Sequence, residues 1–250
     1  MSPPFLPQFS DHQKQHSEQW NNEARGIMAP AASSAAPDIC HALAPILFAS
    51  SFLHLQSRLF ATDIADIYSG KIDEILSSAY AEWQQTLTQN QTDSEREQAL
   101  RHWRNRSHFA IALSELWGHD DITASYQRLS LIAEQAVKGC VEHLLSASPT
   151  GSGWVILALG KLGAGELNFS SDIDLIILHD SKGSQKPASH FIALTRSLSR
   201  LLSRQTSDGF GWRVDLRLRP DMGGGAVSQD IDAAASYYET TARSWERAAF

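Results

Sequence analysis

The amino-acid sequence predicts an α+β protein, with a helical amino-terminal layer followed by a small mixed sheet flanked by helices. Apolar residues recur at helical spacing over residues 38–146, whereas 154–159 and 173–178 are continuous apolar runs typical of buried strands. The change comes at the turn-rich sequence SASPTGSG, residues 146–153. We therefore expect three parts: a poorly ordered leader over residues 1–37, a helical region over residues 38–146 and a second domain over residues 151–250.

The composition indicates a globular protein and excludes several classes of function. Hydrophobic residues make up 42% of the 250 residues, enough for a core, and the net charge of −7 argues against a general nucleic-acid binder. The leader has no apolar signal region, and no apolar run reaches the roughly 18 residues of a membrane span. Cys40 and Cys140 are far apart and outside any zinc-binding pattern. We therefore expect a reduced, cytoplasmic protein that binds neither nucleic acid nor membrane.

The leader and the helical region differ in their patterns. The leader is rich in Pro, Ser, Ala and Gln without a periodic apolar face, which predicts an extended or poorly ordered arm. Amphipathic helices are then expected from Asp38, over 71–87, from the capping residues Asp93 and Ser94 to Gly118, and after Asp120 and Asp121 to residue 146. The tryptophans of this region are interpreted as core residues: Trp83, Trp103 and Trp117.

The second domain is expected to alternate strands and helices. Strands are predicted over 154–159, 173–178 and 210–218, with a helix over 188–204 between the last two. Residues 231–250 have a helical pattern, and nothing resembling a C-cap follows Phe250. We therefore expect the chain to be a fragment, truncated at its carboxy end.

Two aspartates one residue apart mark the candidate site. In an extended segment side chains alternate, so Asp172 and Asp174 point to one face while Ile173 and Leu175 point to the other. A third carboxylate, Asp215, lies on the third predicted strand. Three carboxylates can hold two Mg²⁺ ions, one to activate the attacking oxygen and one to neutralise the leaving oxygen and the phosphate charge. The sequence therefore predicts a magnesium site for nucleotidyl chemistry.

The turn before these aspartates has groups suited to phosphate. Gly160, Gly163 and Gly165 let the main chain approach phosphate oxygens, and Lys161 adds a point charge. Hydroxyl groups for further hydrogen bonds come from two neighbouring residues, Ser170 and Ser171. The turn is neither a Walker A loop nor a dinucleotide fingerprint. An alternative stays open for Lys161, as a solvated loop residue.

The third strand also has a predicted basic face. By the period of two, Arg213, Asp215, Arg217 and Arg219 share one side, so Arg217 and Arg219 can clamp phosphate near the metal. Arg213 can instead pair with a structural carboxylate. The histidines form no catalytic cluster, and His179, at the far end of the acidic strand, is given no role.

These motifs resemble a known family. A strand, a Gly-Lys turn and then Asp-Ile-Asp-Leu resemble the nucleotidyltransferase superfamily of DNA polymerase β. The longer strings GKLGAGELNFSSDIDLI, DGFGWRVDLRLRP and SYYETTARSWERAAF resemble the glutamine synthetase adenylyltransferase/deadenylylase family from about Leu100 to Phe250. The resemblance implies a DNA-polymerase-β-like nucleotidyltransferase domain over residues 151–250.

The resemblance also implies a function. The family is a two-headed enzyme, and this chain looks like its amino-terminal, deadenylylating half. Phosphate would attack the adenylyl phosphorus on a glutamine synthetase tyrosine and release ADP, with Mg²⁺ at Asp172, Asp174 and Asp215 and phosphate positioned by Arg217 and Arg219. Glutamine synthetase would be the protein substrate, ATP, ADP and phosphate the small ligands, and a PII-type signalling protein a partner.

Departures and alternatives accompany this expectation. Ala164 stands where the family often has a further glycine, and residues 221–226 differ from the usual Phe-Gly-rich loop. The substrate contacts are therefore less well defined than the metal ligands. Two other functions stay open: adenylyl transfer from ATP in the forward direction, and a non-catalytic module that docks glutamine synthetase or a PII-type protein through its helical layer.

Overall fold

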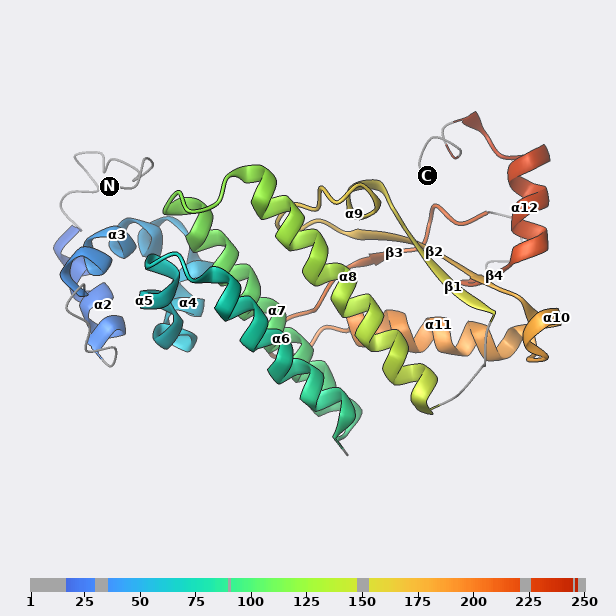
Figure 1. Cartoon of the computed structure of the whole chain (residues 1–250), viewed down its shortest axis with the longest axis horizontal. Helices are drawn as coiled ribbons and strands as arrows, with labels where there is room; N and C mark the ends of the chain where they lie inside the picture. Colours follow the sequence, from blue (N-terminus) through green and yellow to red (C-terminus); the bar gives the residue numbers. More distant parts are fainter. Residues whose placement is uncertain are drawn as a thin grey trace. The chain divides into compact units, whose positions relative to one another are not determined.

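The computed structural model describes residues 17–29, 36–89, 91–147, 153–220, 226–244 and 246, and confirms the α+β class (Figure 1). Helices account for most of the described chain, and the strands form one four-stranded sheet. None of the described helices combines the length and apolar character needed to cross a membrane.

The chain divides into two compact units. The helical unit comprises Met1–Glu82 and Trp103–Ser125, and the sheet unit comprises Trp83–His102 and Tyr126–Phe250. This division does not follow the joint at residues 146–153, because parts of the predicted helical region belong to the sheet unit. The domain bounds drawn from the sequence stay a prediction.

The helical unit begins with a helix that the sequence analysis did not expect. Helix α2, Ser17–Met28, lies within the predicted leader and buries Ala24, Ile27 and Met28. These residues are three and four positions apart, so they form one helical stripe, but three apolar residues are too few to stand out in a polar segment. The expectation of a poorly ordered arm was wrong for this part. Residues 1–16 and 30–35 lie outside the described residues.

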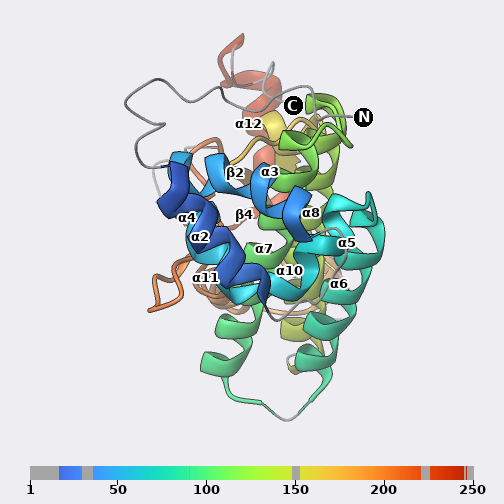
Figure 2. The same cartoon turned by 90° about the vertical axis from the view of Figure 1, so that its left-hand side faces the viewer.

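Short helices follow in the same unit. They are α3, Ala36–Ala49, α4, Ser51–Leu59, the 3₁₀ turn η2, Ala61–Asp63, and α5, Ile64–Tyr68. Figure 2 shows α2, α3 and α4 side by side. Arg106 fixes η2 to α7, Asp93–Leu116, through a two-pronged ion pair with Asp63, with N–O distances of 2.6 and 2.9 Å.

The long predicted helices are confirmed. Helices α6, Ile72–Thr88, α7 and α8, Ile122–Ala147, follow the predicted ranges within a few residues. The predicted cap of α7 was displaced, because Thr92 and Glu95 form a capping box in which the Thr92 amide donates to Glu95 at 2.7 Å. Trp83, Trp103 and Trp117 are buried, as the sequence analysis expected.

The sheet is mixed and centred on its second strand. Strand β1, Trp154–Leu159, pairs antiparallel with β2, Ile173–His179, and β3, Val214–Asp215, and β4, Gln229–Asp230, each run parallel to β2. The first two strands match the predicted ranges. The third was predicted over 210–218 and is only two residues long, and β4 was not predicted.

Helices complete the sheet unit. Short helices α9, Gly160–Gly163, and α10, Ser181–Ser184, follow β1 and β2, and α11, Ala188–Ser203, matches its prediction. Phe191 of α11 stacks on His179, so α11 covers the sheet face that carries Ile173 and Leu175. Helix α12, Ile231–Thr240, is shorter than predicted, and residues 245 and 247–250 lie outside the described residues.

Candidate functional site

The three candidate carboxylates lie at one end of the sheet. Asp172 immediately precedes β2, Asp174 is its second residue, and Asp215 ends β3. In the parallel register Asp174 lies directly opposite Asp215, which places their side chains on the same face. The pairing of β2 with β3, two segments that are distant in the sequence, therefore brings Asp174 and Asp215 together.

The three carboxylates are close enough for their charges to interact. The pKa of Asp174 is raised above its ordinary value, first by burial and then by the negative charges of Asp215 and Asp172. The pKa of Asp215 is lowered, chiefly because Arg217 donates hydrogen bonds to its carboxylate. Two carboxylates that face each other thus have opposite shifts, and a cation at Asp174 would relieve the repulsion there.

The glycine turn makes room beside Asp174. Gly160 opens α9 directly after β1 with a φ of +54°, a left-handed conformation that glycine adopts readily. A Cβ atom at this position would lie 3.0 Å from Oδ2 of Asp174. A Cβ atom at Gly163 would lie 2.6 Å from the carbonyl oxygen of Ala158. The first glycine keeps space at the carboxylate, and the second keeps the turn close to the strand.

Asn168 organises the loop between the glycine turn and β2. The Ser171 hydroxyl donates to the Asn168 side-chain oxygen, and Nζ of Lys161 lies 3.5 Å from the same oxygen. Ser170 has a φ of +61° and offers its carbonyl oxygen to Arg213 at 2.5 Å. Of the predicted phosphate-binding residues, Lys161 therefore lies on α9, and Ser170 and Ser171 lie on the loop that follows it. Asn168, which sequence reasoning missed, joins Lys161 to Ser171.

Two buried polar side chains hold the loops that carry the carboxylates. Ser130 of α8 accepts a hydrogen bond from the Leu167 amide at 2.9 Å and fixes the loop before Asp172. Arg101 of α7 donates to the Gly209 carbonyl at 3.0 Å and fixes the segment before β3. Sequence reasoning missed both, and their signal was a polar residue within an otherwise apolar helix face.

Arginines pair with two of the carboxylates. Nε of Arg213 donates to Asp172, which agrees with the alternative that Arg213 pairs with a carboxylate, here a candidate metal ligand. Nε of Arg217 lies 3.0 and 2.8 Å from the two carboxylate oxygens of Asp215, and its backbone amide donates to the same group at 2.8 Å. Both pairs leave the arginine side chain largely exposed to solvent.

The predicted arginine face beyond Asp215 was wrong. Strand β3 ends at Asp215, and the chain then turns, with the Arg219 amide bonded to the Leu216 carbonyl at 3.3 Å. Arg219 donates through Nε to Ala226 at 2.9 Å and through Nη1 to Leu216 at 2.7 Å. Side chains stop alternating here because the Asp215 carboxylate accepts a hydrogen bond from the Arg217 backbone amide, which bends the chain into a turn. The phosphate roles of Arg217 and Arg219 stay predictions.

The donor set suits a divalent cation. Three carboxylates supply the oxygen ligands that Mg²⁺ prefers, and Gly160 leaves space beside the central one. Within the described ranges, no three or more His, Cys, Asp or Glu side chains converge closely enough to hold a metal ion. Because Asp172 and Asp215 are engaged by arginines, a cation would have to take over those oxygens.

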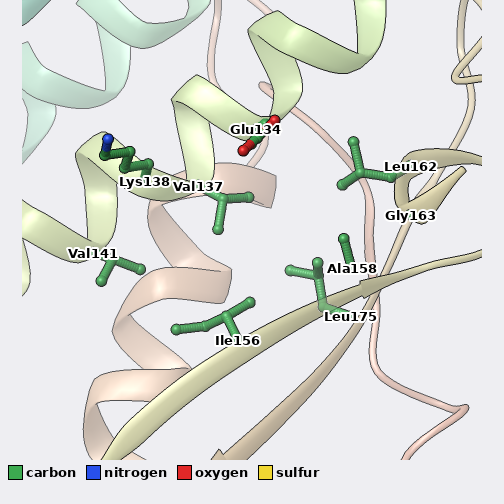
Figure 3. Close-up of a pocket in the computed structure, with 9 residues that line it drawn as sticks. All are labelled: Glu134, Val137, Lys138, Val141, Ile156, Ala158, Leu162, Gly163 and Leu175. Atoms are coloured by element: carbon green, nitrogen blue, oxygen red, sulfur yellow. The ribbon is translucent and has the colours of Figure 1, made fainter. Parts of the chain in front are cut away.

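A separate hollow lies on the opposite face of the sheet. Its volume is about 490 Å³, and its walls come from α8, the two long strands and α9 (Figure 3): Glu134, Val137, Lys138, Val141, Ile156, Ala158, Leu162, Gly163 and Leu175. Leu175 follows Asp174 in β2, so its side chain points away from the carboxylates. The cavity is mainly apolar, and the amino group of Lys138 points away from the strands (Figure 3).

Other reactive groups are buried and serve packing. His179 is buried, its Nδ1 lies 2.8 Å from the Ser228 hydroxyl, and burial lowers its pKa. Cys40 and Cys140 are buried free thiols, and burial raises the pKa of Cys140 to about 12. A thiol with so high a pKa is a poor nucleophile at neutral pH.

Sequence comparisons point to one family. Residues 41–250 match the sequence model described as glutamate-ammonia ligase adenylyltransferase. Three similar proteins are each named bifunctional glutamine synthetase adenylyltransferase/adenylyl-removing enzyme. That of Rhizobium meliloti is 41% identical over 180 residues, which cover 63% of this chain and 18% of the relative. The Mesorhizobium japonicum protein is 34% identical over 227 residues, which cover 83% and 23%. The Rhodopseudomonas palustris protein is 32% identical over 238 residues, which cover 88% and 24%. The chain thus spans less than a quarter of the length of these relatives.

Proposed function

We propose that the end of the sheet that carries Asp172, Asp174 and Asp215 catalyses removal of an adenylyl group from glutamine synthetase. The chain belongs to the glutamate-ammonia ligase adenylyltransferase family. The observation that carries the proposal is the direct pairing of Asp174 with Asp215, with Asp172 one residue before the same strand and Gly160 leaving space beside Asp174. These carboxylates form a set of oxygen ligands at the end of a strand. Beside them is a turn whose glycine backbone allows phosphate to approach closely.

Asp172, Asp174 and Asp215 would hold Mg²⁺, whose bound form supplies charge neutralisation at phosphate and activation of the attacking oxygen. The repulsion that raises the pKa of Asp174 supports a cation at this point. The remaining tasks belong to the chain itself. The backbone of Gly160 lets phosphate approach beside Asp174, and nearby side chains bind and orient it. Gly163 is the weaker candidate, because it packs closely against the Ala158 carbonyl.

The proposed phosphate-binding side chains come from α9, from the loop before β2 and from the turn after β3. Lys161 contributes a positive charge, and Ser170 and Ser171 contribute hydroxyl donors. Arg217 lies beside Asp215 with its side chain in solvent, which suits contact with a phosphate-bearing ligand. Arg219 is the weaker candidate, because two loop carbonyls already engage its guanidinium group.

The proposed direction is phosphorolysis. An oxygen of inorganic phosphate attacks the adenylyl phosphorus, a new P–O bond forms, and the bond from phosphorus to the tyrosine oxygen breaks. The products are ADP and the unmodified tyrosine. The string GELNFSSDIDLI resembles the deadenylylating half of the family, and the relatives' names include adenylyl removal. The same names also include adenylyl transfer, which supports ATP-dependent modification as the second candidate.

The proposal includes partners and a location. Adenylylated glutamine synthetase would be the protein substrate, in line with the names of the relatives. A PII-type signalling protein as regulator follows from the family resemblance of the sequence, and a cytoplasmic location from its cysteine usage.

Product analysis tests the direction. The chain is incubated with Mg²⁺, phosphate and adenylylated glutamine synthetase, and ADP is measured. A parallel reaction contains ATP and unmodified glutamine synthetase, and pyrophosphate is measured. ADP in the first reaction supports removal, and pyrophosphate in the second supports transfer. If neither product forms while the chain is folded and saturated with Mg²⁺, catalysis by this chain is refuted.

A further inference from the structure

The contacts of Arg217 differ from those of the other arginines near the carboxylates. Arg213 binds the Ser170 carbonyl as well as Asp172, and its guanidinium lies 5.6 Å from the centre of the Phe210 ring. Arg219 binds two loop carbonyls. Within the part of the chain that the structure describes, the guanidinium group of Arg217 donates its hydrogen bonds to Asp215. Among these three, Arg217 is therefore the one held by a candidate metal ligand alone.

We propose that Arg217 is an exchangeable counter-ion: it neutralises Asp215 while the site lacks a divalent cation, and it turns to the phosphate of a ligand when the cation binds. This inference rests on the proposed function, because it takes Asp172, Asp174 and Asp215 as the cation ligands. It adds a coupling between metal binding and phosphate binding.

The exposure of the pair allows the exchange. The Arg217 side chain is 86% exposed, whereas that of Asp215 is 13% exposed. The guanidinium is thus held by the carboxylate and by little packing, so it can swing into solvent without opening the core. Its backbone amide also donates to Asp215 at 2.8 Å, which keeps the arginine close after its side chain has left.

Charge supplies the reason for the exchange. The pKa of Arg217 is raised first by its hydrogen bonds to Asp215, with smaller contributions from the charges of Asp172 and Asp174. The guanidinium therefore lies in the field of all three carboxylates. A divalent cation between them would repel it, and the planar fork of arginine matches phosphate oxygens with two hydrogen bonds.

Binding measurements test the exchange without relying on turnover. MgCl₂ is titrated by calorimetry into the wild-type chain and into Arg217→Gln, Arg217→Lys, Asp174→Asn and Arg200→Gln. Arg200 is a matched control, because it forms an exposed ion pair with Asp93 in the same unit. ADP affinity is then measured with and without Mg²⁺, and circular dichroism checks that each variant is folded.

The expected result has two parts. Arg217→Gln binds Mg²⁺ about two- to fivefold more tightly than the wild type, because an exposed competing ion pair has been removed. In the same variant ADP affinity in Mg²⁺ falls about tenfold, because a charge-assisted contact to phosphate is lost. Arg217→Lys, which keeps the charge but not the fork, is expected to restore the competition with Mg²⁺ but only part of the ADP affinity.

The outcomes separate this inference from the proposed function. If Asp174→Asn abolishes Mg²⁺ binding but Arg217→Gln binds Mg²⁺ like the wild type, the exchange is overturned and the cation site stands. An equal gain in Arg200→Gln also overturns the exchange, because it would reflect net charge alone. If Mg²⁺ does not bind, or binds equally well to Asp174→Asn, both the cation site and the exchange are overturned.

Discussion

The two faces of β2 divide the work of the sheet unit between packing and chemistry. On one face Ile173, Leu175 and Ile177 are fully buried beneath helices. The other face carries two carboxylates: Asp172, which immediately precedes the strand and is 43% exposed, and the half-buried Asp174. Because alternate residues of one strand serve the two faces, substitutions on the packing face should mainly change stability, and substitutions on the carboxylate face should mainly change binding and catalysis.

The largest expected effect is on the carboxylate face. Asp174→Asn should lower ADP formation from adenylylated glutamine synthetase by at least about 100-fold, because a neutral amide is a poor substitute for a carboxylate ligand of Mg²⁺. Asp232→Asn is the matched control, since Asp232 of α12 forms an exposed ion pair with Lys182 of α10. Wild-type turnover in Asp174→Asn would remove Asp174 from the site.

The packing face should respond through stability. Ile177→Ala should lower the free energy of unfolding by about 2–5 kcal/mol, because it leaves a cavity in the core. Val155→Ala is its control on the neighbouring strand, where Val155 is 43% exposed, and should change stability by less than about 0.5 kcal/mol. Urea unfolding measures both. Mg²⁺ affinity per folded molecule should be the same in both variants, and a loss in Ile177→Ala would mean that the faces are coupled.

Substitutions at two glycines distinguish the effect of backbone strain from the effect of filling the space beside Asp174. Gly160 and Gly165 both have positive φ, but only at Gly160 would a Cβ meet Asp174. A Cβ at Gly165 would have no atom of the described residues within 4 Å. Gly160→Ala and Gly165→Ala should each lose about 1–2 kcal/mol of stability. Only Gly160→Ala should also weaken Mg²⁺ binding in calorimetry. Equal Mg²⁺ affinity in the two variants would show that this space is irrelevant to the cation.

The smallest expected effect distinguishes the two facing carboxylates by pH. In metal-free buffer, the raised pKa of Asp174 favours the folded state below its unfolded pKa, and this contribution is lost as pH rises through the folded pKa. The lowered pKa of Asp215 contributes stability above its unfolded pKa that is lost as pH falls through the folded pKa.

At neutral pH, therefore, Asp174→Asn should unfold at a higher temperature than the wild type, and Asp215→Asn at a lower one. Both differences should shrink as the pH falls below the carboxylate range. Thermal unfolding followed by circular dichroism in EDTA measures them. Shifts of the same sign in the two variants would contradict the opposite electrostatic environments of these residues.

Long periodic segments of the fold were predictable from the sequence, and features set by few residues were not. Helices α6, α7 and α8 repeat their apolar residues over several turns, so their ranges could be read with small errors. Helix α2 has only three buried apolar or small residues and was missed. Strand β3 was predicted too long, because contacts from Arg217 and Arg219 to nearby backbone and side-chain oxygens make a turn that alternation does not reveal.

The candidate site was predictable in its residues and less so in its contacts. Strand spacing placed Asp172 and Asp174 on one face, but the register that sets Asp174 opposite Asp215 depends on pairing over about 40 residues of chain. The buried anchors Ser130 and Arg101 reach these loops from helices far away in sequence. Local patterns carry no information about such contacts.

In the proposed site, Asp172, Asp174 and Asp215 together hold a divalent cation next to the adenylyl phosphate. A crystal structure of the chain with Mg²⁺ and ADP tests it most directly. We expect Mg²⁺ to lie within about 2.0–2.1 Å of carboxylate oxygens from these aspartates, with a phosphate oxygen of ADP as a further ligand. Mg²⁺ and ADP bound elsewhere, with the three aspartates making no contact to either, would contradict it.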